Sequence, residues 1–187
     1  MKVLPTKLPG VYIIEPLVFS DARGFFMETY HQRRYSEADI QQSFVQDNLS
    51  RSIQGTVRGL HYQVNHAQAK LIQVIRGSVF DVAVDIRRGS QCFGQWTGVN
   101  LTGDNKRQVY IPEGFAHGFC VLSEVADVVY KCSDFYAPGD EWGILWSDPD
   151  LAIDWPVSKP VISAKDSRLP RLVDVPPEKL PSHESKR

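Results

Sequence analysis

Apolar and polar residues alternate with a period of two through most of this chain, and this alternation limits its fold more than any other feature. The clearest run is SVFDVAVDIRRG, residues 78–89. One face of an extended strand carries Phe80, Val82, Val84 and Ile86, and the other carries Asp81, Ala83 and Asp85, because successive side chains point to opposite faces. Similar runs cover residues 11–14, 25–30, 43–50, 56–63, 70–75, 95–101, 108–112, 117–122 and 127–132, with another expected at 143–146.

Helical patterning is scarce. Residues 31–42 form the one good helix candidate, and a short helical turn is expected after Pro149. Gly, Pro, Asn and Asp residues separate the strand-like runs at the spacing of sandwiches and barrels. The pattern predicts an all-β fold, an antiparallel double-sheet barrel of the jelly-roll type with few short helices. We expect one domain over residues 1–175 and a flexible, proline-rich and charged tail over residues 176–187.

The charge balance excludes several classes of function. The 187 residues include 21 Lys and Arg against 22 Asp and Glu, a formal net charge of -1. Without a basic excess, neither nucleic acid nor an anionic membrane is expected as a partner. Residues 1–16 hold no apolar stretch of signal-peptide length, and no run of about 18 apolar residues occurs, so we expect a cytoplasmic protein.

Large polar side chains occur inside several predicted strands, where a plain sandwich would place apolar ones. RGLHYQ, residues 58–63, carries both Arg58 and His61. In a strand, His61 points away from Leu60 and Tyr62 and faces either water or a lined cavity. Further examples are Glu28, Gln46, Asn48, Lys70 and Tyr130. Five strands that each donate a large polar group indicate a shared polar cavity, because closed barrels hold ligands in this way.

Two segments, GTVRGLHYQ and IPEGFAHGF, resemble the half-motifs of the cupin superfamily, in which many members bind a metal ion through histidines and an acid. Here Gln63 replaces the second imidazole of the His-x-His pattern, and Lys70 lies in the region of the acid. A lysine beside a divalent cation is electrostatically unfavourable, and the remaining candidate ligand, His66, lies in a loop. We therefore expect a cavity without metal. The cysteines at 92, 120 and 132 have no C-x-x-C spacing and give weak support to zinc or a disulfide.

Eight segments, in order between about residue 10 and residue 172, resemble the dTDP-4-dehydrorhamnose 3,5-epimerase family. They are DARGFFMETY, FVQDNLS, GTVRGLHYQ, AKLIQVIRGSVFDVAVDIRRGS, YIPEGFAHGF, YKCSDFY, WGILWSDPDLAIDWP and SAKDSRLP. The resemblance implies a jelly-roll cupin, a homodimer and no cofactor. It implies epimerisation at C3 and C5 of dTDP-4-dehydro-6-deoxy-D-glucose, and a segment around Phe26 that reaches into the barrel of the neighbouring subunit.

The resemblance also implies roles for individual residues. It makes His61 the base, Asp166 the acid paired with it, Tyr130 the proton donor and Lys70 the group near the ketone oxygen. Nucleotide-sugar binding positions are matched by Arg23, Phe26, Glu28, Gln46, Asn48, Arg58, His117, Glu141 and Lys165.

These residue types suit the implied chemistry. The 4-ketone acidifies the hydrogens on C3 and C5, so epimerisation needs a base, an acid across the ring and a group that holds the enolate oxygen. Histidine has an ordinary pKa of about 6.5 and can act as a base near neutral pH, with a carboxylate on its other nitrogen. An ammonium such as Lys70 stabilises the enolate more than the ketone, which is the condition for catalysis.

Three alternatives stay open from the sequence. The first is an epimerase of the same family that acts on C3 or C5 alone. The second is a metal-dependent cupin oxygenase. The third is a non-catalytic cupin that binds a sugar nucleotide.

Overall fold

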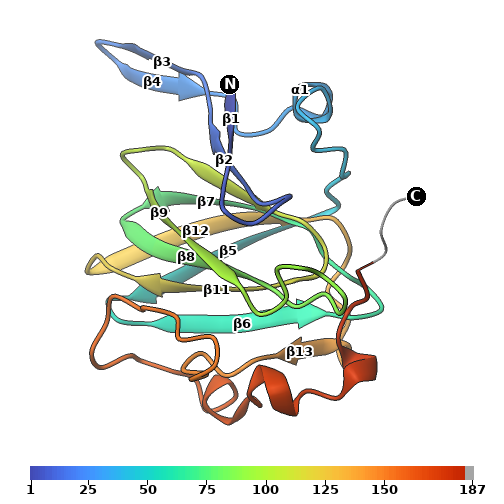
Figure 1. Cartoon of the computed structure of the whole chain (residues 1–187). Coiled ribbons are helices and arrows are strands. Elements are labelled where there is room, and N and C mark those ends of the chain that lie inside the picture. The colour runs from blue at the N-terminus through green and yellow to red at the C-terminus, as the bar shows by residue number, and fades with distance from the viewer. Residues whose placement is uncertain (184–187) are drawn as a thin grey trace.

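The computed structural model describes residues 1–183, and its regular elements are mostly strands (Figure 1). None of the helices in this part of the chain is long and apolar enough to cross a membrane. The strands are β1 (Lys2–Pro5), β2 (Tyr12–Glu15), β3 (Val18–Asp21), β4 (Gly24–Met27), β5 (Gln46–Ile53), β6 (Val57–Gln63), β7 (Lys70–Arg76), β8 (Ser78–Asp85), β9 (Trp96–Thr102), β10 (Gln108–Ile111), β11 (Phe115–Val121), β12 (Val125–Cys132) and β13 (Glu141–Gly143). The helical elements are α1 (Gln32–Ser36) and the 3-10 turns η1 (Asp166–Arg168), η2 (Leu172–Asp174) and η3 (Pro177–Lys179).

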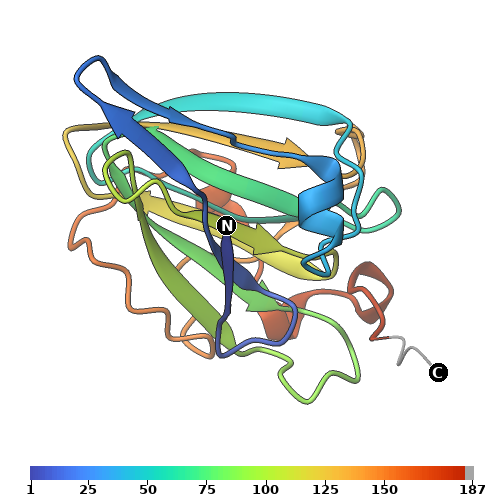
Figure 2. The same cartoon turned by 90° about the horizontal axis from the view of Figure 1, so that it is seen from above.

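Two antiparallel sheets face each other across a common core (Figures 1 and 2). The six-stranded sheet has the order β1-β2-β10-β7-β12-β5, and the five-stranded sheet has the order β13-β6-β11-β8-β9. Strands distant in sequence, such as β5 and β12, are neighbours in this topology. The arrangement confirms the predicted all-β, double-sheet fold.

Both faces of the five-stranded sheet are buried. Val128 of the six-stranded sheet and Phe119 of the five-stranded sheet belong to one apolar core between the sheets. A second core lies on the other side of the five-stranded sheet, where Val84 of β8 and Leu180 of the C-terminal segment are buried. Ala83 of β8 belongs to the core between the sheets. The inward face of β8 is therefore the one that carries its aspartates.

The outer face of the six-stranded sheet is only partly covered. Tyr35 and Ile40, in and after α1, pack on the part of this face formed by β2 and β10. Other apolar side chains on the same face, at the far part of β5 and β7, stay open to solvent in the single chain, with Leu49 66% exposed, Ile53 60% and Ile75 53%.

The β3–β4 hairpin extends away from both sheets (Figure 1). It exposes three phenylalanines, Phe19 at 58%, Phe25 at 59% and Phe26 at 70%. Side chains of this size are unusual on a free surface when they lie together. The hairpin is therefore a candidate contact region.

Some elements differ from the sequence-based expectations. α1 is shorter than residues 31–42, since Asp39 has a left-handed φ of 64° that ends the helical path. Residues 143–146 are not a strand of their own, because the last strand, β13, ends at Gly143. The strands β1 and β3 were not predicted, because their side chains are mostly exposed and carry no apolar alternation.

The C-terminal segment packs on the domain over the residues that the structure describes, where the sequence had indicated a flexible tail. Leu180 is only 7% exposed, and Arg88 pairs with Ser182 in a parallel bridge. The apolar outer face of the five-stranded sheet supplies the physical reason, because it needs a cover. Residues 184–187 of the same tail lie outside the described residues.

Candidate active site

Two adjoining cavities lie between the sheets. The larger has a volume of about 700 Å³ and the smaller about 240 Å³, and both are lined by His61, Lys70 and Tyr130. Most of the residues predicted from the sequence to form the site line one cavity or both. These residues are Gln46, Asn48, Arg58, His61, Lys70, His117, Tyr130, Glu141, Lys165 and Asp166.

The predicted base and its carboxylate partner meet although they are far apart in the sequence. His61 Nε2 lies 2.8 Å from Asp166 Oδ1 across a separation of 105 positions. The backbone N–H of Gly59 donates a longer hydrogen bond, 3.4 Å, to Asp166 Oδ2. Burial acts to raise the pKa of Asp166, but the hydrogen bond and charge of His61 outweigh it, so this pKa lies below its ordinary value. With Nε2 bound to an ionised carboxylate, Nδ1 of His61 is the nitrogen available as a base.

An irregularity in β6 brings Arg58 and His61 to the same cavity. In the pairing of β6 with β11, His61 lies opposite His117 and Arg58 lies opposite Phe119, so β6 has one residue more between the two pairs. Strict alternation would place Arg58 and His61 on opposite faces, but the extra residue lets both line the larger cavity. The irregularity requires Gly59, which has a φ of 125° and whose added Cβ would lie 2.6 Å from a backbone atom of β11.

Lys70 and Tyr130 face His61 from the opposite sheet. They belong to the adjacent strands β7 and β12, and both line the two cavities that His61 lines. Burial lowers the pKa of Lys70, and nearby groups, including the Cys132 thiol and the Glu141 carboxylate, partly oppose this effect. Burial raises the pKa of Tyr130, so its phenol is neutral near pH 7 and can donate a proton.

Further predicted binding groups are held by hydrogen bonds at the cavity wall. Arg58 Nε donates to Ser52 Oγ at 2.9 Å, which fixes the guanidinium in the larger cavity. Lys165 and Glu141 form an ion pair with each other. Burial acts to raise the pKa of Glu141, but the hydrogen bond and charge of Lys165, the charge of His61 and the Tyr136 hydrogen bond together outweigh it, and the pKa is lowered. These groups are charged and suit a ligand with anionic and polar parts.

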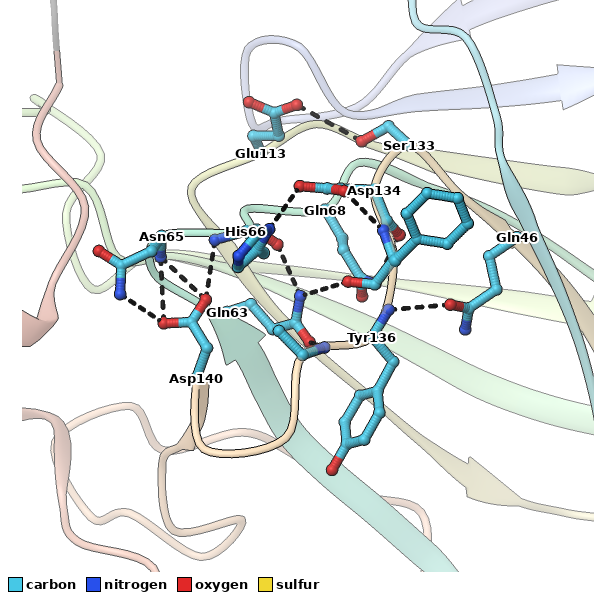
Figure 3. A network of polar contacts seen from close by, with 12 residues as sticks. Gln46, Gln63, Asn65, His66, Gln68, Glu113, Ser133, Asp134, Tyr136 and Asp140 are labelled. Carbon is cyan, nitrogen blue, oxygen red and sulfur yellow. Dashed lines mark hydrogen bonds and ion pairs between the residues drawn. The ribbon is translucent and has the colours of Figure 1, made fainter.

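A polar network at the rim of the smaller cavity joins the loops that follow β6 and β12 (Figure 3). Asp140 accepts hydrogen bonds from the backbone N–H groups of Asn65 and His66, at 2.9 and 2.8 Å. Gln46 Oε1 accepts one from the backbone N–H of Tyr136 at 2.8 Å. The predicted binding residue Gln46 therefore also fixes the loop that carries Tyr136.

Three of the predicted binding residues do not reach the cavity of their own chain. Arg23 and Phe26 lie on the exposed β3–β4 hairpin, where Arg23 pairs with Asp21 at 2.6 Å. Glu28 pairs with Arg34 at 2.9 Å, beside α1. None of the three lines either cavity.

Sequence reasoning did not identify Tyr136 or Asp81 as site residues. Tyr136 lines the smaller cavity and donates from its hydroxyl to Glu141 Oε2 at 3.2 Å. Asp81 lies 2.8 Å from His117 Nε2 through its Oδ2. The sequence does contain a sign that Asp81 is unusual. It interrupts an apolar strand, and the next residue on the same face, Ala83, is not a cation that could pair with it.

His66, the remaining candidate metal ligand from the sequence, lies outside both cavities. Its Nδ1 is 3.1 Å from Asp134 Oδ2 at the surface. Among residues 1–183, no group of three or more His, Cys, Asp or Glu side chains is arranged to hold a metal ion.

Comparisons with known proteins point to one family. The profile of the family described as dTDP-4-dehydrorhamnose 3,5-epimerase matches residues 5–174. The dTDP-4-dehydrorhamnose 3,5-epimerase of Shigella flexneri is 54% identical over 176 residues, 93% of this chain and 97% of that protein. The enzyme of the same name from Pseudomonas aeruginosa is 56% identical over 168 residues, 89% of this chain and 93% of that one.

A solved structure extends the similarity to the fold. The dTDP-6-deoxy-D-glucose-3,5-epimerase of Legionella pneumophila, in complex with dTDP-4-keto-L-rhamnose, is 51% identical with a TM-score of 0.96. The match covers 98% of this chain and 99% of that one. On the family match and these identities, the chain belongs to the dTDP-4-dehydrorhamnose 3,5-epimerase family.

Proposed function

We propose that this protein is an isomerase that epimerises C3 and C5 of dTDP-4-dehydro-6-deoxy-D-glucose to give dTDP-4-dehydro-L-rhamnose. The observation that carries the proposal is the placement of His61 on one sheet and Tyr130 on the other, with the cavity between them. Epimerisation removes a proton from one face of a carbon and returns one to the opposite face. Groups on facing sheets can contact opposite faces of one sugar ring.

In the proposed mechanism, Nδ1 of His61 takes the proton next to the ketone. The carboxylate of Asp166 holds the tautomer and stabilises the imidazolium that forms. The Lys70 ammonium stabilises the enolate oxygen, and the neutral phenol of Tyr130 donates a proton from the other sheet. Asp166 and Tyr130 are used in the charge states that their surroundings favour.

The binding groups would hold the nucleotide around this centre. Arg58 and Lys165 are cations on the wall of the larger cavity and can contact the diphosphate. Gln46, Asn48 and Glu141 line the smaller cavity and can accept or donate to the sugar and base. His117 would contact the substrate beside His61. The cytoplasmic location expected from the sequence stays a prediction.

The reaction is tested by incubating the enzyme with the substrate in heavy water. Deuterium at both C3 and C5 is the expected result. Label at one carbon alone would replace the proposal with a single-site epimerase, and the absence of label would favour a binding protein without activity.

A homodimer with exchanged hairpins is the second part of the proposal. Arg23, Phe26 and Glu28 match binding positions but lie outside their own cavity, and the hairpin exposes Phe26 at 70%. The open apolar side chains of β5 and β7 offer a surface for a second copy. We infer that each hairpin completes the site of the partner chain.

Heterodimers distinguish exchange from a site built within one chain. His61→Asn and Arg23→Ala homodimers are both expected to be nearly inactive. If hairpins are exchanged, a heterodimer of the two variants contains one intact site, which combines the cavity of the Arg23→Ala chain with the hairpin of the His61→Asn chain. Recovered activity, about half that of the wild-type dimer if the two sites act independently, supports exchange, and no recovery in purified heterodimers contradicts it.

A further inference from the structure

Asp81 is a buried carboxylate inside the barrel that the proposed mechanism does not use. It lies on the inward face of β8 and is 1% exposed. Its Oδ2 contacts His117 Nε2 at 2.8 Å, and its Oδ1 has no hydrogen-bond donor among the described residues. Burying a carboxylate costs folding free energy unless its charge is compensated, so a buried Asp81 needs a functional or structural explanation.

The contact of Asp81 with His117 repeats the geometry of the proposed catalytic pair. His117 and His61 lie directly opposite each other on β11 and β6. Each has its Nε2 2.8 Å from a buried carboxylate, Asp81 for His117 and Asp166 for His61. Each therefore keeps Nδ1 as the nitrogen available to a ligand in the larger cavity that both line.

Lys70 faces this second pair from the other sheet. The titratable groups around it are Cys132 and Tyr130 of β12, Glu141 of β13, His61 of β6, His117 of β11 and Asp81 of β8. Removal from water lowers the pKa of Lys70. The charges of Cys132, Glu141 and, as the smallest of the three, Asp81 act to raise it again.

The other carboxylates of the site already have partners. Glu141 pairs with Lys165, and Asp166 pairs with His61. Asp81 contacts His117 alone, and no Lys or Arg side chain of residues 1–183 forms an ion pair with it. Asp81, like Asp166, therefore has a histidine and no fixed cation as its partner, and of the two only Asp81 has a carboxylate oxygen without a donor among the described residues.

We propose that Asp81 is a positioning residue of the epimerase, which aims His117 at the substrate and supplies the buried negative charge that keeps Lys70 an ammonium. The proposal rests on the proposed function for Lys70. It explains why a costly carboxylate lies inside the barrel. It also predicts that loss of the charge acts on Lys70 without any contact being removed from it.

The first test is the pH profile of kcat for Asp81→Asn, which keeps the shape and removes the charge. Activity needs the protonated amine and is lost as the pH rises through the pKa of Lys70. Without the Asp81 charge, this loss of activity at high pH (the basic limb of the profile) should move to lower pH. An unchanged basic limb would overturn the proposal.

Two matched variants separate the charge from other effects. Asp85→Asn removes another buried carboxylate of the same strand, which binds Arg87 and Ser90 outside both cavities, and its basic limb should stay in place. His117→Gln removes the ring but keeps the Asp81 charge, so it should raise KM and leave the basic limb unchanged. A shift of the limb in His117→Gln equal to that in Asp81→Asn would contradict a role for the charge.

A direct titration makes the result independent of turnover. In protein labelled with ¹³C and ¹⁵N lysine, the Lys70 signal is assigned by its loss in Lys70→Ala and followed against pH by NMR. A lower midpoint in Asp81→Asn than in wild type supports the proposal, and an equal midpoint refutes it. Should Asp81→Asn fail to fold, Asp81→Ser takes its place. Failure of deuterium incorporation in the wild type would instead reject the proposed function and leave this titration valid.

Discussion

Replacing Asp166 tests how much of the proposed catalysis depends on one carboxylate. When His61 takes a proton, an imidazolium forms 2.8 Å from Asp166 Oδ1, and the Asp166 side chain is only 5% exposed. Two unit charges about 4 Å apart interact by about 4 kcal/mol at the effective dielectric constant of such sites. The neutral imidazole already gains about 1 kcal/mol from its hydrogen bond, so about 3 kcal/mol applies to the transition state alone. Asp166→Ala should therefore reduce kcat/KM by roughly a hundredfold.

Asp166→Asn should be worse than Asp166→Ala, although it is the smaller change. The backbone N–H of Gly59 points at Oδ2 and will select the amide oxygen of the new asparagine. The amide NH₂ then takes the place of Oδ1 and donates to His61 Nε2, which moves the ring proton to Nδ1. A base protonated on its working nitrogen cannot act, and we expect a loss of roughly a thousandfold or more.

Steady-state kinetics with the sugar nucleotide measure both variants. Asp134→Asn is the matched control, because it breaks the pair with His66 at the surface, 3.1 Å long, and should leave the rate unchanged. A loss below about tenfold in both Asp166 variants would refute the reasoning, since it would mean that the charge contributes less than about 1.4 kcal/mol.

Five further changes have expected outcomes. Lys70→Ala should lower kcat by roughly a hundredfold with little change in KM, since the ammonium acts on the enolate, and steady-state kinetics that show only a higher KM would exclude that role. Gly59→Ala should cost about 3 kcal/mol or more in urea unfolding, because its Cβ would lie 2.6 Å from the Cα of Gly118. Gly89→Ala, with a φ of 84° and open space, should cost only about 1 kcal/mol, and equal costs would contradict the steric argument. The pKa of Asp166 is lowered on folding, so its contribution to stability is present above its unfolded pKa and is lost as the pH falls through the folded pKa. The difference in free energy of unfolding between the wild type and Asp166→Asn should therefore narrow as the pH falls below about 4. Treatment with a chelator should leave activity unchanged, and loss that iron restores would point to the oxygenase alternative.

The sequence predicts the buried strands well because each of them shows a local pattern of alternating or β-branched residues. β8 and β12 follow runs of alternating or β-branched residues, and their bounds lie within a few residues of the predicted ones. β1 and β3 show no such pattern, because most of their side chains are exposed. The local sequence also does not determine which face of a strand points into the core between the sheets. Alternation separates Asp81 from Val82, but only the second core beneath the five-stranded sheet explains why the aspartate face turns inward.

The site follows the same division between local and distant information. The polar residues of β6, β7 and β12 could be assigned to one cavity because their strands were expected to share a barrel. Their contacts could not be derived, because the pairing of His61 with Asp166 depends on where η1 packs, 105 positions along the chain. In the proposed dimer, Arg23 and Phe26 would act in the site of a second chain, and no pattern within one chain fixes a position in another.

Because the proposed base and proton donor lie on facing sheets, the rate of the proposed reaction should also depend on how the core side chains pack between the sheets. Stacked sheets lie about 10 Å apart, a separation set by the side chains packed between them. His61 and Tyr130 are on different sheets, so the distance between base and proton donor is held by core residues such as Val128 and Phe119. A misplacement of about 1 Å between reacting groups can cost roughly a hundredfold in rate. Core substitutions that leave every cavity residue intact should therefore reduce turnover before they unfold the domain. If the base and donor lay on one strand, such substitutions would change stability alone.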